Sequence, residues 1–362
     1  MFATYAGGYS RRPLPAQPDV LAAAERDLRE GRIDDEAYRA AADDFVREIL
    51  DEMAVVELGI VGEGGVRACD RVLPWILGLD GVSAGDATTL PDGEPVTRPV
   101  VSGPVSWSGP IAVRDWLFAD DASDLFVKQT IVGPYTLASL AAPAEASRRA
   151  SLADQFGEAL NLEIRALHEA GCAMVEVDDS MAVRIGDDVR EWRVFRSAHE
   201  RLTGGLDDAL HLSLGLWGGA IDPAGFASLI DLPYKSYLVD ALAGPSSWRF
   251  IDTVPPTRGI VVGAAEARTE ALPETEVLVW AMAWAAEDDR GSDRIGVAPN
   301  GSLWSVGRHF AHRKCQRLGE AVRIGSMGPL PDVALALDED PIRSKMPELR
   351  ALAAAVTAAR GH

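Results

Sequence analysis

Short apolar runs that end in polar or acidic residues recur along the chain, and helix-length amphipathic segments separate most of them. The clearest run spans residues 173–179, where Ala, Met and Val lead into Glu176, Asp178 and Asp179. Continuous apolar runs of this length are typical of strands buried on both faces, as in parallel sheets covered by helices. Carboxylates at the end of such a strand indicate where the chain leaves the core. The pattern therefore predicts an α/β protein with functional groups at its strand ends.

The same pattern predicts eight buried strands. A helix that ends in Glu-Leu-Gly precedes residues 60–63, as Glu-Ala-Gly precedes residues 173–179, and consecutive αβ units produce such recurrence. Eight βα units close most simply into a (β/α)8 TIM barrel, and an open doubly wound sheet is the alternative. The predicted strands cover residues 2–8, 60–63, 126–133, 173–179, 209–216, 236–240, 258–263 and 294–299.

Three further segments lie outside these strands. Sequence rich in Ala, Leu, Arg and Glu predicts N-terminal helices within residues 15–58. Residues 80–110 are rich in Gly, Pro, Asp and Thr and predict an insertion over one end of the barrel, with an extra hairpin strand at 98–107. An Ala-rich helix is predicted at 347–360. We expect residues 1–362 to form a single barrel domain with these additions.

The net charge of −20 on 362 residues opposes binding to phosphate backbones and to anionic lipid surfaces. A composition with 47% hydrophobic and 25% charged residues is typical of a globular enzyme with a sizeable core. The sequence therefore predicts a soluble protein whose partners are small molecules, with no nucleic-acid or membrane partner. A homodimer is one expected assembly of the chain.

The three cysteines, Cys69, Cys172 and Cys315, are far apart and form no CxxC pair. This spacing argues against a disulfide framework and against a structural zinc cluster. The N-terminus lacks the basic and apolar segments of a secretory signal, and the uncharged run at 131–144 is too short to span a membrane. We therefore expect a reducing, cytoplasmic location.

Polar residues at the predicted strand ends are the candidate site. No GxGxxG after a strand, no GxxxxGK and no HExxH occurs, so dinucleotide, P-loop and zincin chemistry have no support. The carboxyl ends of barrel strands meet on one concave face, where such polar groups would come together. The candidates are Glu63, Lys128, Asp178, Asp179, His211, Asp240, Glu266 and Asn300, with Tyr135, Trp217 and Trp304 on the following loops.

Five segments between about residue 3 and about residue 325 carry a family resemblance. They are residues 6–11 (AGGYSR), 62–63 (GE), 128–136 (KQTIVGPYT), 171–179 (GCAMVEVDD) and 211–213 (HLS). They resemble the C-terminal catalytic half of the cobalamin-independent methionine synthase family, which is a (β/α)8 barrel. The resemblance implies a methyl or alkyl transferase that acts on a small substrate.

The resemblance also implies a metal position. That family activates the substrate thiol with zinc, held by a His and a Cys two residues apart, a Glu on the next strand and a Cys on the last strand. The matching positions here hold His211, Ser213, Asp240 and Asn300, so only the histidine is retained. Replacing two thiolates by a hydroxyl and an amide removes both charge and softness from the ligand set. We expect a weak site at His211 and Asp240 or no zinc, unless an off-motif cysteine such as Cys69 or Cys315 completes it.

Other family positions divide into retained and lost groups. Glu63 and Asp178 match the carboxylates that bind the homocysteine amino group, so recognition of a cationic group is implied. The family's first-strand Ser is Gly8 here, and its Asp-x-His proton donor falls at 262–264 (VGA). A folate is the donor that the resemblance implies, and Lys128 and Tyr135 would orient it.

The substrate-binding set predicted in this way is Glu63, Asp178, Lys128, Tyr135, Trp217 and Asn300, and the catalytic set is Glu63, Asp178, Asp179 and His211. We predict one-carbon or alkyl transfer to a small thiol or amino-acid-like substrate. One alternative is a metal-free lyase, isomerase or decarboxylase, as in the broader superfamily with uroporphyrinogen decarboxylase, that uses the strand-end carboxylates as acid and base. A second alternative is a non-catalytic homologue that binds a small molecule.

Overall fold

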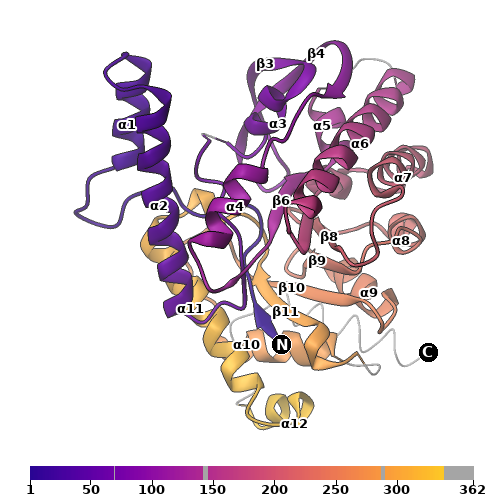
Figure 1. Cartoon of the computed structure of the whole chain (residues 1–362). Helices are drawn as coiled ribbons and strands as arrows, with labels where there is room; N and C mark the ends of the chain where they lie inside the picture. Colours follow the sequence, from indigo (N-terminus) through magenta and orange to yellow (C-terminus); the bar gives the residue numbers. More distant parts are fainter. Residues whose placement is uncertain (69, 142–145, 287–289, 338–362) are drawn as a thin grey trace.

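A curled parallel sheet of seven strands forms the core of the computed structural model, which describes residues 1–68, 70–141, 146–286 and 290–337 (Figure 1). Helices lie around the outer side of this sheet. All neighbouring strands in it are parallel. In spatial order the strands are β1 (Phe2–Ala3), β11 (Ile295–Pro299), β10 (Gly259–Ala265), β9 (Ser236–Asp240), β8 (His211–Leu216), β7 (Met174–Asp178) and β6 (Gln129–Val132).

A second parallel pair continues this sheet. β2 (Ile60–Val61) pairs with β5 (Phe126–Val127), and only Lys128 separates β5 from β6 in the chain. The Lys128 amide donates to a β2 carbonyl at 2.8 Å, and the Gly59 amide donates to the Ala3 carbonyl at 3.0 Å. Each of the eight predicted strands therefore has a counterpart, and β2 lies between β1 and the strand that leads into β6.

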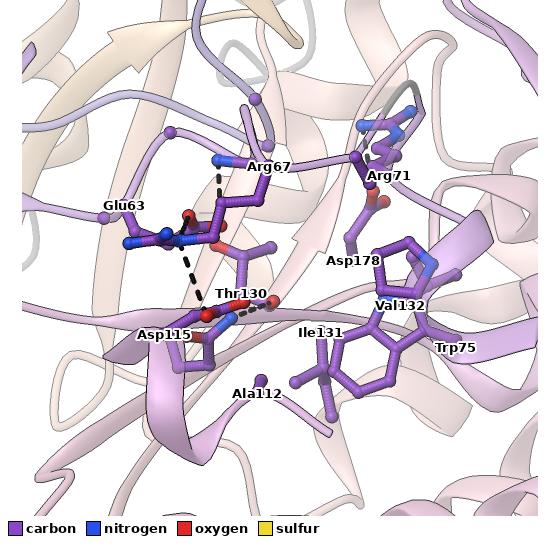
Figure 2. Close-up of a pocket in the computed structure, with 18 of the residues that line it drawn as sticks. Glu63, Arg67, Arg71, Trp75, Ala112, Asp115, Thr130, Ile131, Val132 and Asp178 are labelled. Carbon is purple, nitrogen blue, oxygen red and sulfur yellow. Dashed lines mark hydrogen bonds and ion pairs between the residues drawn. The ribbon is translucent and has the colours of Figure 1, made fainter. Parts of the chain in front are cut away.

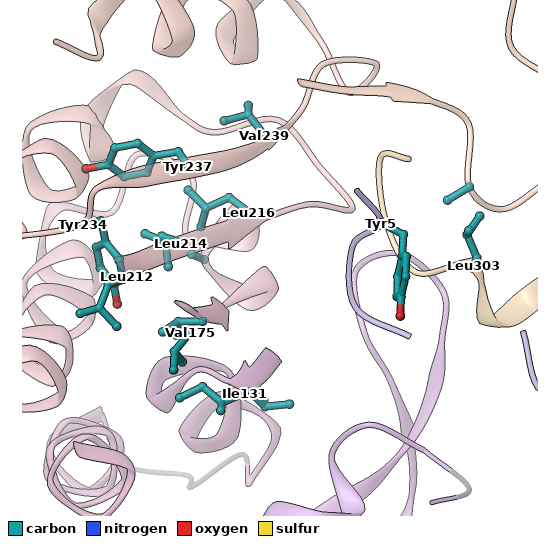
Figure 3. Packing of buried hydrophobic residues seen from close by; sticks show 14 of the residues in the cluster. Tyr5, Ile131, Val175, Leu212, Leu214, Leu216, Tyr234, Tyr237, Val239 and Leu303 are labelled. Atoms are coloured by element: carbon teal, nitrogen blue, oxygen red, sulfur yellow. The ribbon is translucent and has the colours of Figure 1, made fainter. Parts of the chain in front are cut away.

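The sheet buries alternate side chains against the helices. Along β8, Leu212, Leu214 and Leu216 share one face and belong to the same apolar cluster as Val175 and Tyr237 of the neighbouring strands (Figure 3). Because side chains alternate along a strand, the remaining β8 positions face the interior of the curled sheet. On β8 the interior positions are therefore polar or small, whereas Leu238 of β9 and Val261 of β10 belong to a second, smaller apolar cluster with Trp217.

The helices begin where the sequence offers capping side chains. Asp19 accepts from the Ala22 amide at the start of α1, and Asp34 does the same for α2. The predicted helix at 347–360 lies outside the described residues. None of the described helices combines the length and the apolar sequence that a membrane span requires. The helices are α1 (Val20–Arg29), α2 (Asp35–Val55), α3 (Leu73–Gly78), α4 (Val113–Asp121), α5 (Pro134–Leu140), α6 (Ala146–Glu169), α7 (Val189–Thr203), α8 (Phe226–Ile230), α9 (Pro245–Thr253), α10 (Thr275–Ala285), α11 (Arg308–Gly325) and α12 (Leu330–Leu335).

The segment predicted as an insertion is an antiparallel hairpin of β3 (Leu79–Thr89) and β4 (Pro95–Trp107). We expected only one strand there, because the Gly, Asp and Ala residues of β3 have little strand propensity. The GVSAG sequence at 81–85 lies within β3 rather than on a strand-to-helix turn, so it does not form a nucleophile elbow. The hairpin tip is buried, with Leu90 at 1% and Glu94 at 6% exposure. The tip therefore packs against the rest of the molecule.

Candidate active site

A cavity of about 90 Å³ lies at the carboxyl ends of β2, β6 and β7 (Figure 2). Glu63, two residues after β2, and Asp178, the last residue of β7, both line it. The carboxyl ends of parallel strands lie at the same edge of a sheet, which explains why residues 115 positions apart in the chain line one cavity. Trp75 and Ile131 supply an apolar wall.

Arg71, which sequence reasoning missed, lies beside this cavity among three carboxylates. Its Nη1 is 2.9 Å from Asp178 Oδ2, its Nη2 donates to Asp92 Oδ2 at 3.0 Å, and its Nε is 3.3 Å from Glu94 Oε2. The guanidinium carbon is 5.4 Å from the ring centroid of Trp217. All three carboxylates are buried, so one guanidinium faces a local excess of negative charge.

Arg67, on the same loop, engages the second predicted carboxylate. Its Nε is 3.3 Å from Glu63 Oε2 and 3.5 Å from Asp115 Oδ1, and its Nη1 pairs with Asp43. Figure 2 shows the Arg67 side chain between Glu63 and Asp115. The Gly65 amide also donates to Glu63 Oε1 at 3.1 Å. Each carboxylate predicted to bind a cation therefore already has an arginine beside it.

Burial controls the protonation of these acids. It raises the pKa of Asp178 to about 7, although the neighbouring Arg71 opposes that shift. It raises the pKa of Glu63 to about 7, where Asp115 adds to the effect, and the pKa of Glu94 to about 7. Carboxyl groups that titrate near neutrality are suited to general acid and base catalysis at physiological pH.

Asp179, predicted to be catalytic, does not line this cavity. It is fully buried, and its oxygens accept from the Tyr135 amide at 3.0 Å and the Thr136 amide at 2.7 Å. The Thr136 hydroxyl and the His199 ring complete its shell at 2.6 and 2.9 Å, and the second His199 nitrogen bonds the Tyr234 hydroxyl. In this position Asp179 fixes the start of α5 and the buried face of α7.

Two predicted substrate-binding residues also lie away from the cavity. Lys128 is buried inside the curled sheet, where its Nζ donates to Glu176 at 2.7 Å and to the Tyr5 carbonyl at 3.0 Å. The Tyr135 hydroxyl donates to Glu191 on α7 at 2.9 Å. Both side chains have protein partners, so the structure gives neither one a contact with the cavity.

Trp217 and Asn300 support the carboxyl end of the sheet. Trp217 is fully buried, and its ring fills the space beside Gly215, where an added Cβ would lie 2.1 Å from the ring. Asn300 donates to Asp240 Oδ1 at 3.1 Å and accepts from the Ala267 amide at 2.8 Å. Burial raises the pKa of Asp240 to about 6. Trp217 thus lies under Arg71, and Asn300 holds Asp240 in place.

Residues 14–201, more than half of the chain, match the family model described as "Cobalamin-independent synthase, Catalytic domain". The chain belongs to this family. The predicted family is therefore confirmed.

Members of the cobalamin-independent synthase family that resemble the chain include two curated proteins. The chain is 29% identical over 174 residues to the 5-methyltetrahydropteroyltriglutamate–homocysteine methyltransferase of Proteus mirabilis. This match covers 47% of the chain and 23% of that protein. The chain is 27% identical over 202 residues to the methionine synthase of Sulfurisphaera tokodaii, and this match covers 56% of the chain and 57% of that protein. The chain thus spans about a quarter to just over half the length of these relatives.

Solved structures of the family share the fold. The B12-independent methionine synthase from Shewanella sp. W3-18-1, in complex with selenomethionine, superposes with a TM-score of 0.72 at 19% identity and covers 89% of this chain and 97% of that one. The putative vitamin-B12 independent methionine synthase from Listeria monocytogenes gives 0.70 at 16% identity, with 89% and 97% covered. At these identities the likeness supports the α/β fold with its curled parallel sheet.

The predicted metal pair of this family, His211 and Asp240, is not brought together. His211 is the first residue of β8, and its Nε2 lies 2.8 Å from the Ser236 hydroxyl at the start of β9. Asp240 is the last residue of β9, four positions beyond Ser236, which separates the two sites by about 13 Å at roughly 3.3 Å per residue. The expected joint site is therefore wrong, because the H-x-S spacing did not show that β8 continues beyond it.

The family's zinc does not fit the described residues. No group of three His, Cys, Asp or Glu side chains in that part of the chain could hold a metal ion. Zinc that activates thiols is bound by thiolates, yet Cys172 precedes β7 at the amino end of the sheet, Cys315 lies on α11, and neither lines the carboxyl-end cavity. Cys69 lies outside the described residues. The sulfur donors that a thiol-activating zinc requires are thus absent from the described carboxyl-end site.

Proposed function

We propose that the chain transfers a methyl or related one-carbon group to a small thiol or amino-acid-like acceptor at the carboxyl-end cavity. The main support is that Glu63 and Asp178, in a chain of this family, line one cavity with raised pKa values. The names of the curated relatives suggest the reactants, a methylated tetrahydropteroylglutamate as donor and homocysteine or a similar thiol as acceptor.

Charge balance suggests how the acceptor binds. Asp178, Asp92 and Glu94 share the single positive charge of Arg71, so a cationic group nearby lowers the electrostatic free energy of the site. An acceptor ammonium would occupy this environment between Asp178 and Glu63. The acceptor's apolar atoms would then pack on Trp75, which lines the same cavity.

The chain's own carboxylates would move the proton. In the proposed step, Asp178 or Glu63 accepts the thiol proton while the sulfur attacks the methyl carbon of the donor. A new S–C bond forms, the bond from that carbon to the donor nitrogen breaks, and the nitrogen keeps the electron pair and takes up a proton. No part of this step passes through zinc, since the described residues do not fit it.

We also propose that the sheet closes into a (β/α)8 barrel. The support is the position of β2, which bonds β1 through the Gly59 amide and the β5–β6 strand through the Lys128 amide. Closure would make the eight strand ends one ring and would place the cavity at its carboxyl-end mouth.

A metal-free reaction such as elimination or isomerisation is the second candidate. The acids with pKa values near 7 and the missing sulfur ligands favour it, because neither feature depends on a methyl donor. Product formed from an amino acid or a carboxylic acid alone, without donor, would identify this reaction.

The deciding experiment incubates the full chain with 5-methyltetrahydropteroyltriglutamate and homocysteine, with and without a chelator, and measures methionine. We expect chelator-resistant turnover that Asp178→Asn reduces by about a hundredfold or more, since Asn cannot accept the proton. Asp51→Asn, at an exposed position on α2, is the matched control. Activity that the chelator abolishes, or that Asp178→Asn leaves intact, would contradict the proposed step.

A further inference from the structure

A second and larger cavity, of about 780 Å³, lies at the opposite end of the sheet. The first residues of seven strands line it, from Phe2 of β1 to Gly259 of β10, together with Arg294 immediately before β11. Since these strands are parallel, their first residues mark the amino end, away from Glu63 and Asp178. This volume is within the range of pockets that bind drug-sized molecules.

Apolar side chains form part of the lining of this amino-end cavity, beside the hydrogen-bonded pair of His211 and Ser236. Phe126, Met174, Ile260 and Val261 contribute to its lining, and Phe126 keeps 46% of its surface exposed. Gly259 lies among them and carries no side chain that would fill the space. An exposed aromatic ring beside a hollow of this size favours an apolar ligand that removes its surface from water.

The rim of the same cavity is positively charged, in a chain with a net charge of −20. Lys235, Arg258 and Arg294 line it against one acid, Asp293. Lys235 donates to the backbone carbonyl of Asp208. Arg258 donates to the Leu232 carbonyl at 3.0 Å and to the Tyr237 hydroxyl at 2.6 Å. The partners of both cations are therefore neutral oxygens. Arg294 is exposed, and no hydrogen bond or ion pair joins its guanidinium to another described residue.

We propose that the amino-end cavity binds an amphipathic monocarboxylate, with its alkyl chain on the apolar lining and its carboxylate among Lys235, Arg258 and Arg294. The charge at the rim selects an anion, and the volume and apolar side chains of the cavity favour a long apolar body. This site is separate from the one-carbon transfer proposed above and does not depend on it.

Titration calorimetry on the full chain tests this with decanoate and decyltrimethylammonium, which share an alkyl chain and differ in charge. The net charge of −20 attracts the ammonium non-specifically, so decanoate binding at least about tenfold more tightly would require a local cationic site. Equal affinities, or tighter binding of the ammonium, would overturn the proposal.

Two variants test whether decanoate binds at the amino-end cavity. Arg294→Glu should weaken decanoate binding by about tenfold, because it reverses a charge at the rim. Arg12→Glu makes the same charge change on the exposed loop after β1, at the carboxyl end, and should leave binding unchanged. Both positions are exposed, so neither variant should affect folding, which thermal unfolding checks. Equal loss in both variants would show general electrostatics and would reject the site.

Acetylation of lysine provides an independent readout. Lys235 is half-buried at the rim, whereas Lys128 and Lys314 are buried at 1% and 0% exposure. Decanoate should slow acetylation of Lys235 severalfold, and decyltrimethylammonium should not. Unchanged labelling under saturating decanoate would show that the ligand binds elsewhere.

Discussion

Asp178 and Asp179 are neighbours in the chain with different environments. Asp178 faces Arg71 at the cavity, and burial raises its pKa to about 7. Asp179 accepts hydrogen bonds from two α5 amides and from the Thr136 hydroxyl, and it contacts His199. At the residue scale, burial thus disfavours the charged form of Asp178 beside the cavity, whereas Asp179 has hydrogen-bond partners at both oxygens within the fold.

This contrast predicts that the same substitution changes stability by very different amounts at the two positions. Asp179→Asn replaces an acceptor by an amide that cannot satisfy all four donors, and we expect it to lower the free energy of unfolding by about 3–5 kcal/mol. Asp178→Asn removes a charge that burial already disfavours, and Arg71 keeps Asp92 and Glu94. Its effect at pH 7.5 should stay within about 1 kcal/mol. Urea unfolding measures the free energy of unfolding of both variants. Similar losses would contradict the different roles of Asp178 and Asp179.

Glu63 predicts a pH dependence of stability. Its pKa rises from an ordinary 4.5 to about 7, so the folded protein binds this proton more tightly than the unfolded chain does. The free energy of unfolding therefore falls as pH increases between these two values. Glu63→Gln removes the ionisation and should raise the Tm by several degrees at pH 8 and by much less at pH 5.

Asp51→Asn, which removes an exposed carboxylate from α2, is the control for Glu63→Gln. It should change the Tm little at either pH. A Glu63→Gln effect that is equal at pH 5 and pH 8 would exclude the raised pKa as its cause.

At the scale of elements, the sequence predicted what local patterns encode. β7 is buried along its whole length, so its apolar run and terminal acids reveal both the strand and its end. Arg71 and its contacts with Asp92 and Glu94 depend on how the β3–β4 hairpin folds back, which no local pattern describes. The predicted metal position at His211 was wrong for a related reason, since a three-residue motif does not show how far a strand continues.

The hairpin tip packs closely against the loop after β8, and Gly218 allows this contact. Gly218 has φ +84°, and an added Cβ would lie 2.6 Å from the Asp92 amide nitrogen. Gly218→Ala should therefore displace the tip that holds Arg71 and lower the free energy of unfolding by about 2–4 kcal/mol, the sum of strain and steric overlap.

A variant at Gly186 separates the contribution of backbone strain from that of steric overlap. It has φ +63° with nothing within 4 Å of an added Cβ, so Gly186→Ala should lose only about 1–2 kcal/mol from strain. Urea unfolding compares the two variants. Equal losses would mean that the contact between Gly218 and the hairpin tip contributes nothing to stability.

The whole molecule has two ends with different charge. The carboxyl end gathers buried and half-buried acids around two arginines, and the amino end has a cationic rim around a partly apolar cavity. All eight predicted strands have counterparts because buried parallel strands have apolar sequences. How β1 and β2 meet could not be predicted, since two-residue strands carry almost no pattern of their own.

Closure of the sheet at β1 and β2 is therefore the prediction to test for the molecule as a whole. If the Gly59 amide donates to the Ala3 carbonyl in solution, its hydrogen exchange should be slower than that of an exposed amide by a thousandfold or more, on the order of core amides. The Lys128 amide, bonded to β2 at 2.8 Å, should be protected to the same degree. Native-state exchange measured by NMR gives both values. Fast exchange at Gly59 with a protected Lys128 would mean that the sheet is open between β1 and β2, and the carboxyl-end cavity would then lie at a free sheet edge rather than within a ring of strands.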